Sequence, residues 1–116
     1  MNELATLTGK SFRFKGSLHE EFIIYPSDND GQAQDRFALT ITAFAIGLVK
    51  SAIKEKGEIF MGASRDKSPK NSLGAILREN GQTPQQLSYL IPILIDAGFC
   101  EYTKEGKAFK IIYNEG

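Results

Sequence analysis

Apolar and polar residues alternate in two short stretches near the start of the chain. Residues 11–15 alternate with a period of two, and residues 21–25 form a β-branched and aromatic run that ends at Pro26. Both patterns are typical of β-strands, and proline ends a strand because it has no N–H group to donate to the ladder. The polar connection between them predicts a β-hairpin. The polar, turn-rich stretch 27–32 then predicts a loop.

A long apolar segment, residues 36–56, predicts the first helix. Its apolar residues recur every three or four positions, which marks one helical face, and a second stripe lies beside it. The first stripe is Phe37, Ile41, Phe44, Leu48 and Ala52, and the second is Ile46, Val49 and Ile53. A surface this wide indicates a helix held on two sides, by the rest of the domain and by the hairpin or a second subunit. Gly57 ends the helix. Residues 37–42 also alternate, so a strand followed by a helix that begins near Thr42 is an alternative.

Shorter elements follow this helix. Residues 58–61 predict a strand, and residues 62–71 predict a loop because they are rich in glycine, serine, proline and charged residues. A short helix then runs to Glu79, capped by Asn71 or Ser72. The polar residues 80–82 form a turn.

The next helix has the clearest start in the chain. Thr83 is its expected N-cap, Pro84 takes the first helical position, and Gln86 completes a capping box. Gly98 is the expected stop. Pro92 breaks the pattern, since a proline inside a helix removes one backbone hydrogen bond and should bend the helix.

The last part of the chain predicts a second hairpin. Residues 99–103 and 108–113 read as strands, joined by a short loop that contains Gly106. Cys100 lies in the first of them and is expected to be a small core residue rather than a reactive thiol. As the only cysteine, it can form no disulfide within the chain, which fits a reducing, cytoplasmic location.

Composition and charge limit the possible functions. The chain has 116 residues, an ordinary single-domain length, and a net charge of zero. Residues 1–36 carry a small acidic excess and residues 37–116 an equal basic excess. Bulk charge therefore cannot drive binding to nucleic acid. No signal peptide and no membrane span are expected, because no apolar run reaches the roughly 20 residues that a span needs.

Enzyme and metal-site motifs are not found in the sequence. His19 is the only histidine, and no second cluster of ligands accompanies it. Gly9-Lys10-Ser11 has the ending of a phosphate-binding loop without the required upstream glycine. We therefore expect no catalytic residues, no metal and no cofactor.

The order of elements from about Phe37 to Tyr113 is helix, strand, helix, turn, helix and hairpin. This order resembles the winged helix-turn-helix superfamily, in which the last helix lies in a DNA major groove. Residues 73–77, Gly81 and residues 83–97 match the helix-turn-helix, and residues 104–107 match the wing tip. The resemblance implies an α+β fold, with residues 1–36 as an N-terminal β-hairpin extension and residues 37–116 as the winged helix domain.

The resemblance also implies which residues would contact DNA. The recognition helix would turn Gln85, Ser88, Tyr89 and Pro92 outward, with Gln86 and Asp96 at the margins, and the backbone at Thr83 would meet a phosphate. Lysines and arginines of the preceding loop and of the wing would meet further phosphates: Arg65, Lys67, Lys70, Lys104 and Lys107.

Two functions from different classes follow. The first is a small DNA-binding protein, a homodimeric regulator of transcription or of replication and partition. The second is a winged-helix module that binds protein without binding DNA, an adaptor or an inhibitor from a mobile element. The second rests on the neutral net charge and on an expected apolar surface of Tyr89, Pro92 and Ile93. The recognition helix also has no Arg or Lys between Gln82 and Ala97.

Overall fold

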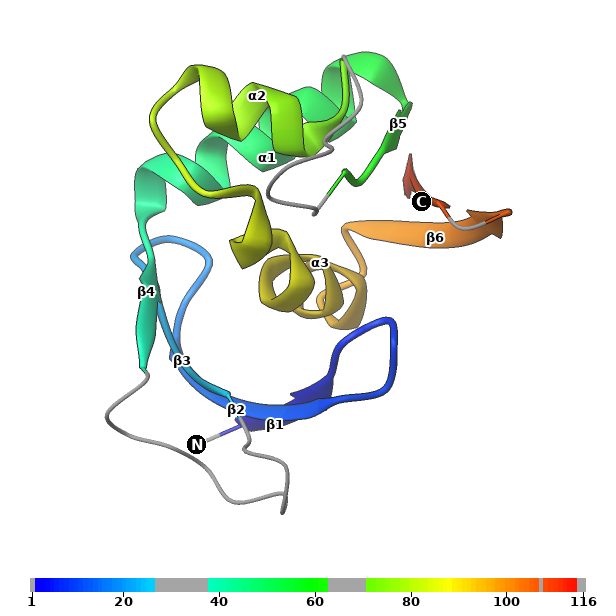
Figure 1. Cartoon of the computed structure of the whole chain (residues 1–116). Helices are drawn as coiled ribbons and strands as arrows, with labels where there is room; N and C mark the ends of the chain where they lie inside the picture. The colour runs from blue at the N-terminus through cyan, green and yellow to red at the C-terminus, as the bar shows by residue number, and fades with distance from the viewer. Residues whose placement is uncertain (1, 27–37, 63–70, 107, 115–116) are drawn as a thin grey trace.

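The computed structural model describes residues 2–26, 38–62, 71–106 and 108–114. These residues form two antiparallel sheets and three α-helices, so the predicted α+β class is confirmed. Figure 1 shows the arrangement, in which helix α3 lies between the first sheet and the helices α1 and α2.

The first sheet has four strands that pair with their neighbours in chain order. The predicted hairpin is confirmed as β2 and β3, which pair from Phe12 opposite Pro26 to Gly16 opposite Phe22. The sheet is larger than the predicted hairpin, because one further strand pairs on each side of it. The strands are β1 (Asn2–Ala5), β2 (Ser11–Gly16), β3 (Phe22–Pro26) and β4 (Leu39–Ile41).

Aromatic side chains cover the inner face of this sheet. Phe12 and Phe14 of β2 are buried while their neighbours in the strand are exposed, as the period-two pattern predicts. Phe14 makes an edge contact with Phe22 of β3 at 5.7 Å between ring centroids. Full burial of one such ring stabilises the fold by about 1.5 to 3 kcal/mol.

Helix α1 (Ala43–Lys56) begins later than residue 36. The alternative start near Thr42 is the one found: the Thr42 hydroxyl accepts a hydrogen bond from the Ala45 N–H at 3.2 Å, and β4 precedes it. The longer helix was wrong because pairing with β3 makes residues 39–41 a strand. Gly57 ends the helix with φ of 76°, as predicted.

The remaining elements follow the predicted order. The Ser72 hydroxyl caps α2 by accepting from the Ala75 N–H. The second sheet has the order β5-β7-β6, so the last strand lies between the other two. The elements are β5 (Glu58–Phe60), α2 (Leu73–Glu79), the 3-10 turn η2 (Pro84–Gln86), α3 (Leu87–Asp96), β6 (Cys100–Glu105) and β7 (Ala108–Tyr113).

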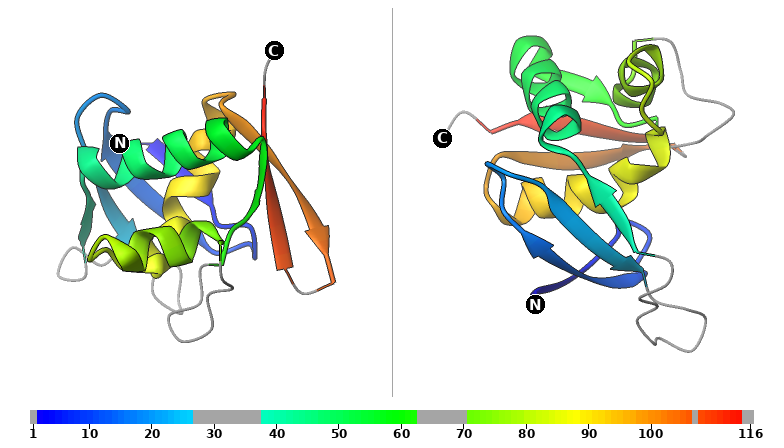
Figure 2. Two further views of the ribbon diagram at one scale, coloured as in Figure 1. Left: turned by 90° about the horizontal axis from the view of Figure 1, so that it is seen from above. Right: turned by 90° about the vertical axis from the view of Figure 1, so that its left-hand side faces the viewer.

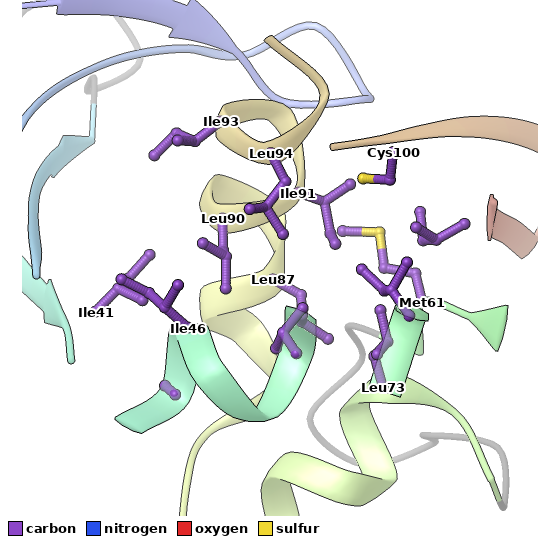
Figure 3. Packing of buried hydrophobic residues seen from close by; sticks show 14 of the residues in the cluster. Ile41, Ile46, Met61, Leu73, Leu87, Leu90, Ile91, Ile93, Leu94 and Cys100 are labelled. Atoms are coloured by element: carbon purple, nitrogen blue, oxygen red, sulfur yellow. The ribbon is translucent and has the colours of Figure 1, made fainter. Parts of the chain in front are cut away.

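Helix α3 is the centre of the core, and most of its residues are buried. Figure 2 shows it between the first sheet and the β6–β7 hairpin, beneath α1 and α2. Figure 3 shows Ile93 on the side of the first sheet and Ile91 on the side of Cys100. A helix that is apolar on all sides is typical of a buried helix rather than of a surface helix.

The turn after β2 provides a test of the first sheet. Gly16 has φ of 122°, and a Cβ atom there would overlap the Glu21 carbonyl oxygen. Gly9 also has positive φ, 96°, but a Cβ atom there would meet nothing within 4 Å.

We expect Gly16→Ala to lower the free energy of unfolding by about 3 kcal/mol, because the backbone must move. The control Gly9→Ala should cost about 1 kcal/mol from its φ alone. Urea denaturation measures both, and equal costs would contradict the turn geometry.

Candidate functional site

A surface cavity of about 570 Å³ lies between strand β4 and the start of α3. Five of the residues that the sequence placed on the recognition helix line it, namely Thr83, Gln85, Gln86, Ser88 and Tyr89, whereas Pro92 and Asp96 do not. Leu39 and Thr40 of β4 form the opposite wall. The structure thus brings these predicted residues together, but in a hollow rather than on a protruding ridge. We call this hollow the β4 cavity.

The turn before η2 places the first residues of the site. Gly81 takes a φ of 74°, and the Gln82 N–H donates a hydrogen bond to the Leu77 carbonyl at 2.8 Å. Asn80 Nδ2 donates to the Ile76 carbonyl at the end of α2. These bonds end α2 and direct the chain toward η2.

The predicted capping box is wrong in its details. The Thr83 side chain makes no capping hydrogen bond, and the segment starts as a 3-10 turn rather than as an α-helix. Gln86 instead donates from Nε2 to the Thr83 carbonyl at 2.9 Å, and its side chain is buried. A buried, internally bonded amide cannot read a base, so Gln86 is a structural residue of the turn.

The expected outward face of the recognition helix is covered in part. Pro92 was expected to face outward and is buried, because α3 lies against the first sheet. Tyr89 is half-buried, and its ring makes an edge contact with Phe12 of β2 at 5.2 Å between centroids. Burial also raises the pKa of the Tyr89 hydroxyl above its ordinary value. Gln85 stays exposed and Ser88 half-exposed, both beside the cavity.

The chemistry of the β4 cavity is neutral. Its lining, among the residues that the structure describes, contains hydroxyl groups, amides and backbone but no ionised side chain. Such a site can exchange hydrogen bonds and accept an uncharged side chain. Its described lining offers no cation for a phosphate.

Of the predicted basic contacts, the structure describes only Lys104. Lys104 is exposed on β6, with Nζ 5.9 Å from the Phe109 ring centroid, and does not line the β4 cavity. Lys110 of β7 forms ion pairs with Glu105 and Glu58, and hydrogen bonds to these two carboxylates raise its pKa. The other predicted phosphate contacts lie outside the described residues: Arg65, Lys67, Lys70 and Lys107.

Sequence reasoning did not assign the β4 wall to the cavity. Leu39 and Thr40 were placed on the first helix, with a strand at residues 37–42 as the alternative that the structure shows. Their place opposite Tyr89 depends on pairing with β3, which a local pattern does not reveal.

Comparison with protein-family models, with curated proteins and with solved structures finds no match to this chain. None of the helices in the described segments is both long and apolar enough to cross a membrane. The same segments contain no group of three or more His, Cys, Asp or Glu side chains that could hold a metal ion. The function is therefore inferred from the chain's own residues.

A substitution at Tyr89 separates a packing role from a purely surface role. We expect Tyr89→Ala to lower the free energy of unfolding by about 2 kcal/mol, because it removes the ring contact with Phe12. Tyr102 on β6 is the control, because it makes a similar edge contact, with Phe109 at 5.8 Å between ring centroids, but is 44% exposed. Tyr102→Ala should therefore cost less than about 1 kcal/mol. Thermal or urea unfolding measures both. An unchanged stability for Tyr89→Ala would show that the first sheet does not rest on this ring.

Cys100 offers a test of burial through its chemistry. Its side chain is 1% exposed, as predicted for a core residue, and burial together with the nearby Glu101 raises its pKa to about 11. The thiol reacts as its thiolate, so at pH 8 native labelling by a disulfide reagent should be about a hundredfold slower than in denaturant. The native rate should rise with pH up to about 11. Equal rates in the native and denatured states would contradict this burial.

Proposed function

We propose that this chain is a winged-helix module that binds protein, and that the β4 cavity receives an uncharged, extended segment of its partner. One observation carries the proposal. Of the residues expected to face DNA, Gln85, Ser88 and Tyr89 line a neutral hollow beside a sheet edge, and Pro92 is buried.

The order of elements supports the winged-helix part of the proposal. Helix α1, strand β5, helices α2 and α3 and the β6–β7 hairpin follow one another as in that superfamily. In the second sheet β7 lies between β5 and β6, so the hairpin pairs back onto the first strand of the motif. The four-stranded sheet is an addition to this arrangement.

The covering of α3 favours protein over duplex DNA. A major groove admits a helix that projects from the protein surface, whereas Pro92 and Ile93 of α3 are buried beneath the first sheet. Duplex binding also requires cations near the reading face, and no ionised side chain of the described residues lines the β4 cavity.

The sheet edge indicates the shape of the partner segment. Strand β4 pairs only with β3 in the described sheet, so its other side is an edge. An extended peptide can add to such an edge through main-chain hydrogen bonds, while a neighbouring hollow selects one of its side chains. The neutral lining disfavours a charged side chain there, because its charge would be desolvated without a partner.

Peptide selection tests the proposal. Peptides selected from a random library on the immobilised protein should shift the amide NMR signals of Thr40, Gln85 and Tyr89. Gln85 is exposed, so Gln85→Arg should leave the fold intact and weaken peptide binding about tenfold by placing a cation at the hollow. Thr103→Arg adds the same charge on exposed β6 and is the matched control.

The variant Gln85→Arg also distinguishes protein binding from the second candidate function, that of a homodimeric DNA-binding regulator. The exposed Lys104 and Tyr102 on the β6–β7 hairpin favour that candidate. If duplex DNA is the ligand, the wild type will be retained on random duplex at low salt and Gln85→Arg will strengthen retention. That result, or selected peptides that shift signals only outside the β4 cavity, would overturn the protein-binding proposal.

A further inference from the structure

A second cavity, of about 430 Å³, lies along α1. It is lined by α1 from Ala43 to Lys54, by the β2–β3 turn, by Phe99 just before β6 and by Tyr113 at the end of β7, and it shares no lining residue with the β4 cavity. Its volume is within the roughly 300 to 1,000 Å³ of small-molecule sites. We call it the α1 cavity.

The charge of the α1 cavity is of one sign. Lys50 and Lys54 line it one helical turn apart, together with His19 from the β2–β3 turn. Residues four apart on a helix project from the same face, so both ammonium groups can reach one anion. No carboxylate of the described residues lines the cavity, and no ion pair of Lys50 or Lys54 occurs within those residues.

Two aromatic rings form another part of the lining. Phe99 and Tyr113 are half-buried, with ring centroids 5.4 Å apart, and Lys50 Nζ lies 5.1 Å from the Phe99 ring centroid. The backbone holds these rings in place. The Tyr113 N–H donates to the Gly57 carbonyl, and the Asn114 N–H donates to the Phe99 carbonyl.

We propose that the α1 cavity binds a small aromatic anion, a planar ring that carries a phosphate or a carboxylate. The lysines hold the anionic group as point charges, and the ring of the ligand packs against Phe99 and Tyr113. Neither half of the ligand is sufficient. A bare anion leaves the aromatic surface uncovered, and a neutral ring leaves the two cations unpaired.

Binding measurements on the whole chain test this site. Adenosine monophosphate is the probe, followed by isothermal titration and by amide NMR shifts at Lys50, Ser51 and Tyr113. Adenosine and inorganic phosphate are the half-ligands, and each should bind about tenfold more weakly than the monophosphate or not measurably. Salicylate supplies the carboxylate form and shows whether the site prefers a phosphate or accepts either anion.

Charge reversal at one lysine gives the matched pair of variants. Lys54 and Lys56 both lie in the last turn of α1, but only Lys54 lines the cavity. Lys54→Glu should weaken monophosphate binding at least about tenfold, and Lys56→Glu, with the same change in net charge, should leave it nearly unchanged. Ser51→Glu, at an exposed lining position, is a second variant that should also abolish binding.

The outcomes separate clearly. The site is supported if the monophosphate or salicylate binds the wild type, binding is lost in Lys54→Glu or Ser51→Glu, and binding is kept in Lys56→Glu. Three results overturn it: no binding of either aromatic anion at millimolar concentration, phosphate binding as tight as monophosphate binding, or equal losses in Lys54→Glu and Lys56→Glu. The β4 cavity takes no part in these measurements, so they do not depend on the proposed function.

Discussion

The contact between the four-stranded sheet and α3 decides what the rest of the molecule can do. Phe12 lies at its centre, because its ring meets Phe14 within β2 and Tyr89 on α3. The sheet covers a side of α3 that would otherwise face solvent, and the apolar residues Pro92 and Ile93 are buried there. Without this layer, α3 would expose a wide apolar surface. With it, α3 becomes an internal helix, and the surfaces available for binding lie at its start and on α1.

The sequence predicted the elements whose signals are local. Gly57 ends α1 through its positive φ, as predicted. Ser72, one of the two predicted caps, begins α2 through its hydroxyl group. The hairpin of β2 and β3 was equally clear, because alternation over a few residues is enough to show it. These features require no knowledge of what packs against them.

The features that were missed depend on partners far away in the chain. Strand β4 exists because it pairs with β3, and this pairing competes successfully with helix formation at residues 39–41. Pro92 was expected on an outer face because the motif, taken alone, leaves that face free. The run of apolar residues from Leu90 to Ile95 is the one local sign that another layer would cover the helix. The β4 cavity likewise forms only where β4 and η2 come together. The residue types alone therefore indicated polar contacts but not that these residues line a cavity.

The placement of charge follows from the same architecture. A chain of zero net charge can bind an anion only where its cations are gathered away from its carboxylates. On the second sheet Lys110 is paired with Glu58 and Glu105, so its charge is locally balanced. On α1, Lys50 and Lys54 have no such partner among the described residues, and Lys54 lies in the last turn, at the end of the helix dipole where cations are favourable.

Helix α1 lines the α1 cavity but contributes no residue to the β4 cavity. Its inner face is fixed in the core by Ile46, Val49 and Ile53, which are almost completely buried, so the helix has little freedom to shift when the α1 cavity is occupied. Coupling between two sites needs an element with two arrangements that both ligands bias differently. A helix anchored by a close-packed core and by the Thr42 cap is not such an element. The two cavities are therefore best understood as independent surfaces, one set by a sheet edge and the other by two lysines that have no carboxylate partner among the described residues.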